Sequence, residues 1–135
     1  MKIVLINSFH VQTINKKISN ENHTEYRCYG VGKIESALHS AFYPGDYPFQ
    51  HGGIAKVAGA LAFYILKAHA FFDGNKRTAL LSSAAFLALN GLSLRYPKPK
   101  SGWSEFAVVL NKAAEGEMSL DDLKEWYESH KVPII

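Results

Sequence analysis

The sequence predicts a mainly α-helical, all-α protein whose 135 residues form one compact helical bundle. Apolar residues recur at three- and four-residue spacing in several segments, most clearly in 54–68, where Ile54, Leu61 and Ile65 share one helical face. Polar or proline- and glycine-rich stretches separate these segments, and no internal repeat or interdomain linker is found. A hydrophobic content of 47% is enough for a single core, so one domain over residues 1–135 is expected.

Two short helices are expected before residue 54. Residues 3–6 are either a short strand or the lead-in to a first helix, for which Ser8 is the candidate N-cap. Residues 20–27 are polar and loop-like, and 34–41 have the pattern of a short helix. Residues 43–53 carry two prolines and three glycines and predict a loop or irregular hairpin.

Three further helices are expected in the second half of the chain. The first covers 77–90, and the others cover 103–115 and 120–130, both amphipathic. Ser119 followed by Asp122 resembles a capping box at the start of the last helix, with Asp in the place usually taken by Glu.

Composition predicts a cytoplasmic protein without naming its activity. The net charge of +3 is mild and the basic residues are scattered, so direct nucleic-acid binding is not expected. The lone Cys28 excludes an internal disulfide framework. The apolar runs 3–6 and 57–66 are too short for a signal-peptide core and a membrane span, so neither targeting nor membrane association is expected.

Residues 69–78, His-Ala-Phe-Phe-Asp-Gly-Asn-Lys-Arg-Thr, place a base, a carboxylate, a glycine and two cations between two helical segments. His69 continues the apolar stripe of the preceding helix, so its side chain is expected to point inward from the helix end. Phe71 and Phe72 are expected to anchor the loop in the core. The loop opens onto the next helix, whose C-cap candidate is Gly91.

This order of residue types indicates phosphate chemistry. A helix N-terminus presents unpaired N–H groups to an anion, and Gly74 lets the backbone approach it closely. Lys76 and Arg77 add positive charge, and because cations oppose the helix dipole there, their presence favours a bound phosphate. Asp73 supplies a hard oxygen for Mg²⁺, and His69 is placed to accept a proton from an attacking hydroxyl.

Structural interpretations of the same residues stay open. His69 by itself would be an ordinary buried, hydrogen-bonded histidine, and Asp73 a turn former or N-cap. Asn75 either caps the helix or shapes the loop, and Thr78 is expected to be structural. A transition-metal site built on His69 and Asp73 is disfavoured, because Gly74 interrupts the helix between them and no third ligand is evident.

The run His-x-Phe-x-Asp-Gly-Asn-Lys-Arg-Thr resembles the signature of the Fic/Doc family, and more closely its Doc, or "death on curing", branch. The similarity extends from about residue 30 to the C-terminal helix. Compared with the nucleotidyl-transferring pattern of the family, Ala70 replaces a proline, Lys76 a glycine and Leu80 an arginine. The last two changes alter positions that hold the distal phosphates of the nucleotide in that branch.

The resemblance implies a Fic/Doc fold and an enzyme, a Doc-like toxin that uses ATP and Mg²⁺ to phosphorylate a hydroxyl on a target protein. His69 would be the general base and Asp73 the Mg²⁺ ligand. The phosphate cradle would consist of Gly74, Asn75, Lys76 and Arg77. Two alternatives remain: a Fic-type protein AMP transferase, and a non-catalytic module that binds a nucleotide or a partner.

The resemblance also implies protein partners. The target would be a translation factor such as elongation factor Tu, aligned by a flap that includes Tyr47, Phe49 and Gln50, in a β-augmentation mode. Self-inhibiting members of the family carry Ser or Thr four residues before a Glu-Gly or Glu-Asn pair. Here Asn111 precedes Glu115 in that spacing, so inhibition is expected in trans from a Phd-like antitoxin.

Overall fold

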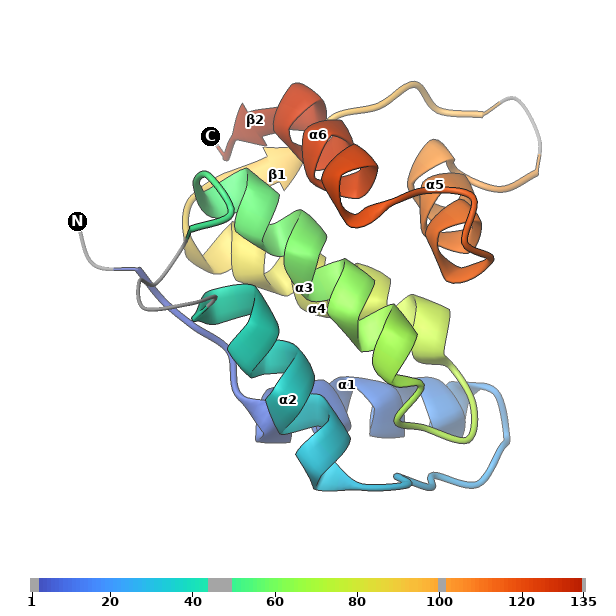
Figure 1. Ribbon diagram of the computed structural model, residues 1–135. Helices are drawn as coiled ribbons and strands as arrows, with labels where there is room; N and C mark the ends of the chain where they lie inside the picture. The colour runs from blue at the N-terminus through green and yellow to red at the C-terminus, as the bar shows by residue number, and fades with distance from the viewer. Residues whose placement is uncertain (1–2, 44–49, 100–101, 135) are drawn as a thin grey trace.

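The computed structural model describes residues 3–43, 50–99 and 102–134. Within these ranges the chain forms six helices and two three-residue strands, so the prediction of a mainly helical protein is confirmed (Figure 1). The elements are α1 (Ser8–Glu21), α2 (Val31–Phe42), α3 (Ile54–Ala68), α4 (Asn75–Leu89), β1 (Leu92–Leu94), α5 (Glu105–Ala114), α6 (Leu120–His130) and β2 (Lys131–Pro133).

Helix α3 is the centre of the bundle and packs against α2, α4 and α6 (Figure 1). Most of its residues are buried, including Val57, Leu61 and Ile65. At Gly59 the backbone of α6 comes so close that a Cβ would lie 2.9 Å from Lys124 Cα. This central position holds α3 firmly between the helices that surround it.

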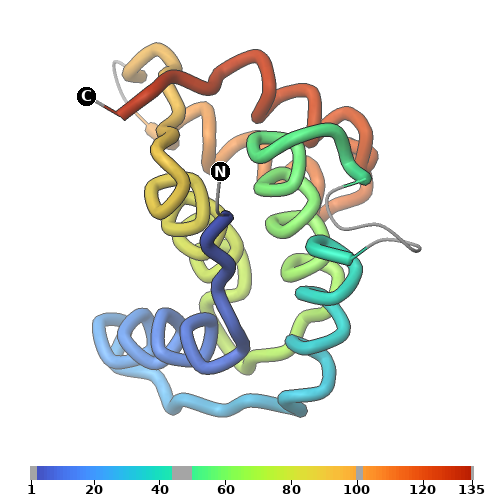
Figure 2. Tube along the Cα trace, turned by 90° about the vertical axis from the view of Figure 1, so that its left-hand side faces the viewer, coloured from blue at the N-terminus to red at the C-terminus, as the bar shows by residue number. Residues whose placement is uncertain are grey.

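Helix α1 lies across the end of α4 where the loop 69–74 joins α3 to α4 (Figure 2). Residues 3–7 form no strand and lead directly into α1, which agrees with the second of the two sequence interpretations. The sequence suggested Ser8 as the N-cap of α1, but the N-cap is Asn7. Asn7 Oδ1 accepts from His10 N at 3.1 Å, and His10 Nδ1 accepts from Asn7 N at 3.0 Å, so the pair forms a capping box.

The other helix boundaries agree with the sequence predictions in most respects. The capping box between Ser119 and Asp122 at the start of α6 is confirmed. Helix α5 is shorter than predicted, because Ser104 caps it and Trp103 lies outside. Helix α4 ends at Leu89 and its C-cap is Asn90, so the prediction of Gly91 as the C-cap is wrong by one residue. Gly91 follows the C-cap in the left-handed conformation, with φ 81°.

The small antiparallel sheet was not predicted. β1 pairs with β2, with Ser93 opposite Val132, and joins the segment after α4 to the end of α6. Among the described residues, no helix combines the length and apolar character needed to cross a membrane.

Candidate active site

His69 is the residue at which α3 ends. Its backbone is left-handed, with φ 44° and ψ 53°, and its side chain is exposed. The prediction of an inward-pointing side chain is therefore wrong. A left-handed residue turns the chain out of the helical path, so the apolar stripe of α3 does not continue through His69. The result is an imidazole that is open to solvent at the edge of the loop.

The segment just before α2 pairs with the loop like a strand. Tyr29 N donates to Ala70 O at 2.7 Å, and Phe72 N donates to Arg27 O at 2.9 Å. Phe71 is fully buried as predicted, but Phe72 is 52% exposed, which corrects its assignment to the core. Successive side chains of an extended segment face opposite sides, so only one of the two phenylalanines can point into the core.

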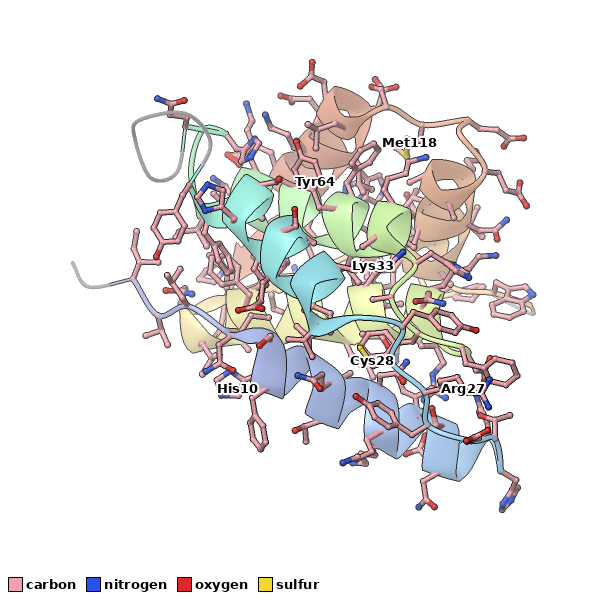
Figure 3. All side chains as sticks on the ribbon, turned by 60° about the horizontal axis from the view of Figure 1, so that its bottom comes forward. His10, Arg27, Cys28, Lys33, Tyr64 and Met118 are labelled. Carbon is pink, nitrogen blue, oxygen red and sulfur yellow. The ribbon has the colours of Figure 1, made fainter. Side chains whose placement is uncertain are left out.

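Figure 3 shows the paired segment from the side on which Arg27 and Cys28 lie. Cys28 forms an isolated antiparallel bridge with Phe71. The guanidinium of Arg27 lies 5.6 Å from the centre of the Phe72 ring, so even the exposed phenylalanine has a partner. The loop is thus held on its outer side as well as by the core.

Gly74 is the N-cap of α4, in the left-handed conformation with φ 75°. A Cβ at this position would lie 2.8 Å from Ile18 Cγ2 and 3.3 Å from Asn15 Nδ2, so α1 leaves no space for a side chain. Asn75 shapes the loop and does not cap the helix, because its side chain bonds both backbone polar groups of Phe71.

Asn15 joins the loop to α1 and was missed in the sequence. Its fully buried amide Nδ2 donates to Asp73 O at 2.7 Å and to Thr78 Oγ1 at 3.0 Å. Thr78 is likewise fully buried, in agreement with a structural role. The available signal was a polar residue on the face of α1 that also carries Val11 and Ile18, because a buried polar side chain needs a partner.

Hydrogen bonds from two residues that follow α1 stabilise the ionised form of Asp73. Its Oδ2 accepts from Asn22 Nδ2 at 3.1 Å and from Thr24 Oγ1 at 2.9 Å. The hydrogen bond from Asn22, followed by that from Thr24, lowers the pKa of Asp73 below its ordinary value, and a backbone hydrogen bond from Gly74 adds to the effect. The group is therefore ionised at neutral pH.

A magnesium ion fits this donor set only if phosphates and water complete its coordination. In the part of the chain that the structure describes, no cluster of three His, Cys, Asp or Glu residues could hold a metal. Mg²⁺ in phosphate-transferring sites usually takes one or two carboxylates and keeps several waters. A single ionised carboxylate beside the N-terminus of α4 meets the carboxylate part of that requirement.

Both cations of the motif already have partners. Arg77 Nη2 lies 3.1 Å from Glu21 Oε2 at the end of α1, and Lys76 Nζ donates to Asn111 Oδ1 on α5. Glu21 balances the charge of Arg77 within the protein, whereas the neutral amide of Asn111 only forms a hydrogen bond with Lys76. The presence of these two cations does not by itself call for a phosphate, which corrects one step of the sequence interpretation.

The flap prediction falls mostly outside the described residues. Tyr47 and Phe49 belong to the undescribed segment 44–49, and Gln50 lies in an exposed turn just before α3. Asn111 and Glu21 were not assigned site roles from the sequence, because their contacts with Lys76 and Arg77 span distant segments of the chain.

A family model, described as the Fic/DOC family, matches residues 5–87, which run from the lead-in to α1 through most of α4. The chain belongs to the Fic/DOC family. No curated protein matches the sequence. Membership implies a transferase that adds AMP or phosphate, and family members typically use ATP with a divalent metal and act on protein substrates.

Proposed function

We propose that the protein is a Doc-like toxin, a kinase-type enzyme that transfers the γ-phosphate of ATP to a hydroxyl of a target protein, with residues 1–135 forming its single domain. The observation that carries this proposal is that a hydrogen-bonded loop holds His69 in a fixed position relative to the N-terminus of α4. The loop between them is bonded to residues 27–29, to Asn15 and to Asn75. A base and an anion-binding helix end are therefore held together, as transfer by positioning requires.

Each residue of the loop has a defined role in the proposed reaction. The His69 imidazole accepts the proton of the attacking hydroxyl. The N–H groups of the first turn of α4, from Asn75 to Arg77, donate to the phosphates beside the backbone of Gly74. The Lys76 and Arg77 side chains exchange their partners Asn111 and Glu21 for phosphate oxygens.

Asp73 would hold Mg²⁺, which supplies charge neutralisation to the phosphates when it is bound. The hydrogen bonds from Asn22 and Thr24 keep the carboxylate ionised and fix its orientation. The protein takes little part in the covalent chemistry of phosphate transfer, so its contribution is positioning and electrostatic stabilisation.

Phosphate transfer is favoured over AMP transfer by two positions of α4. Lys76 places a long cationic side chain where the nucleotidyl-transferring pattern has a glycine. Leu80, one turn further on, packs against the hydrophobic core and offers no charge to a distal phosphate. A pocket for the β- and γ-phosphates is therefore reduced, which supports a nucleotide bound with its γ-phosphate toward His69.

The proposed target is a translation factor, with elongation factor Tu as the leading candidate, and the proposed site of action is the cytoplasm. A flap that includes Tyr47, Phe49 and Gln50 would align the target segment by backbone pairing. A Phd-like antitoxin would inhibit the enzyme in trans, by folding a disordered tail onto its surface.

The proposal is tested by incubating the purified protein with elongation factor Tu, ATP and Mg²⁺ and measuring the intact mass of the factor. A mass increase of one phosphate supports the proposal. An increase of one AMP identifies an AMP transferase instead. An unmodified factor, together with no modified protein in a bacterial lysate, favours a binding module.

A further inference from the structure

Two cavities adjoin the two ends of the loop that carries the motif. The first, of about 520 Å³, lies between α2 and α3 and reaches Ala68, next to His69. It is an open groove with hydroxyls and lysines along it, and Figure 3 labels Lys33 and Tyr64 on this face.

The second cavity lies at the Lys76 end of the loop, between the N-terminus of α4 and α5, and has a volume of about 430 Å³. It is more enclosed than the first and mostly apolar. Its lining consists of Lys76, Trp103, Val108, Asn111, Lys112 and Glu117. The volume is in the range of small-molecule sites, and a few polar groups in an apolar wall are typical of them.

Trp103 is the unexplained member of this lining. Its side chain is 81% exposed, more than any other large hydrophobic residue among those described, and it precedes the N-cap of α5. Trp126, by contrast, is 8% exposed and packs against Phe106. The core does not use the Trp103 indole, although a tryptophan face is a strong platform for stacking a planar ring.

We propose that the cavity beside α5 binds the base of the nucleotide, with the Trp103 indole stacked on the ring. This inference rests on the proposed function, because it assigns a place to part of the same substrate. Lys76 belongs both to the wall of this cavity and to the phosphate loop, so one nucleotide can reach from the cavity to the N-terminus of α4. The phosphates then extend from Lys76 toward His69, with the terminal phosphate nearest the His69 imidazole.

The test compares two ligands that share phosphates but not a ring, ATP and inorganic tripolyphosphate, by calorimetric titration of the full chain with Mg²⁺. The unmodified protein is expected to bind ATP more tightly than tripolyphosphate. Trp103→Ala is expected to weaken ATP binding by about tenfold, the typical effect of losing one stacked base, and to leave tripolyphosphate binding unchanged. Trp103→Phe, which keeps an aromatic face, retains most of the affinity.

Phe9→Ala is the matched control, because Phe9 is also strongly exposed, at 70%, but lies on α1 away from the cavity lining. It is expected to bind both ligands as the unmodified protein does. Equal ATP affinity for Trp103→Ala and the unmodified protein overturns the inference, and so does an equal loss for both ligands. If the unmodified protein binds neither ligand, the proposed function fails as well, so the two failures are distinguishable.

Discussion

The side chain of Asn75 forms two hydrogen bonds with the main chain of Phe71. Asn75 Nδ2 donates to Phe71 O at 2.8 Å, and Asn75 Oδ1 accepts from Phe71 N at 3.1 Å. The first residue of α4 thereby closes the loop that begins at His69. Phe71 is fully buried, so no solvent can replace these bonds if the amide is removed.

Asn75→Ala should therefore destabilise the fold by about 1–3 kcal/mol, the usual cost of leaving buried polar groups unpaired. Urea denaturation followed by circular dichroism measures the change. Asn20→Ala is the control, because Asn20 is exposed near the end of α1. A variant at position 75 that is as stable as this control would show that the loop keeps its shape without the amide.

Gly74→Ala should cost more than Gly91→Ala, although both glycines flank α4 in the left-handed conformation. Both variants carry the backbone penalty of about 1–2 kcal/mol. Only at Gly74 would the new Cβ meet a neighbour, Ile18 Cγ2 at 2.8 Å, whereas nothing lies within 4 Å at Gly91. The overpacking adds about 1–3 kcal/mol. Equal shifts of the thermal midpoint in the two variants would contradict the close approach of α1 to the loop.

The sequence predicted those elements whose signals are local. The helical spacing of apolar residues located α3, and the Ser119 and Asp122 pair located the start of α6. The strands β1 and β2 escaped prediction because three residues give no alternation, and their pairing joins segments far apart in the chain. The sequence indicated Ser8 as the N-cap of α1, but asparagine caps a helix as well as serine does, and the hydrogen bond that identifies Asn7 is visible only in the structure.

In the candidate active site, too, the features that could be predicted were those with a local sequence signal. The order of residues in the motif indicated the loop and the helix end, since glycine and asparagine have strong local preferences. The direction of His69 depended on a left-handed backbone at a non-glycine residue, which periodicity cannot indicate. The contacts of Asn15, Glu21 and Asn111 with the loop arise from tertiary packing between distant segments. Only Asn15 gave a signal, as a polar residue on an apolar helix face, and that signal does not identify its partner.

Asp73→Asn should weaken nucleotide binding in the presence of Mg²⁺ more than in its absence, because the substitution removes a charged oxygen ligand. Calorimetric titration with ATP, with Mg²⁺ and with EDTA, measures both affinities. Equal losses under the two conditions would assign Asp73 to supporting the loop alone.

The same substitution should change the pH dependence of stability. Because the pKa of Asp73 in the folded protein is below its ordinary value of 3.8, the ionised carboxylate stabilises the fold above that pH. This contribution is lost as the pH falls through the folded pKa. The difference in unfolding free energy between the unmodified protein and Asp73→Asn should therefore be largest near neutral pH and shrink below about pH 4. A difference that grows toward acid would contradict the assigned hydrogen bonds.

Glu21→Gln should raise the affinity of the site for tripolyphosphate, by about two- to fivefold at low salt, because it releases Arg77 and removes a negative charge near the N-terminus of α4. Stability should change by no more than about 1 kcal/mol, since the pair is half exposed. Glu128→Gln makes the same change in net charge near the end of α6, where the partner is Lys131. If Glu128→Gln raises the affinity for tripolyphosphate by the same factor, the effect is due to net charge and not to the release of Arg77.

The transferred group is identified most directly with ATP labelled at either the α- or the γ-phosphate, using elongation factor Tu as acceptor and His69→Ala as the inactive control. We predict that γ-label marks the target and α-label does not, and that His69→Ala lowers the rate by about 10²–10⁴-fold while circular dichroism shows an intact fold. Lys76→Gly should reduce phosphate transfer without creating efficient AMP transfer, because Leu80 still offers no charge. Incorporation of the α-label by the unmodified protein would contradict the account and identify an AMP transferase.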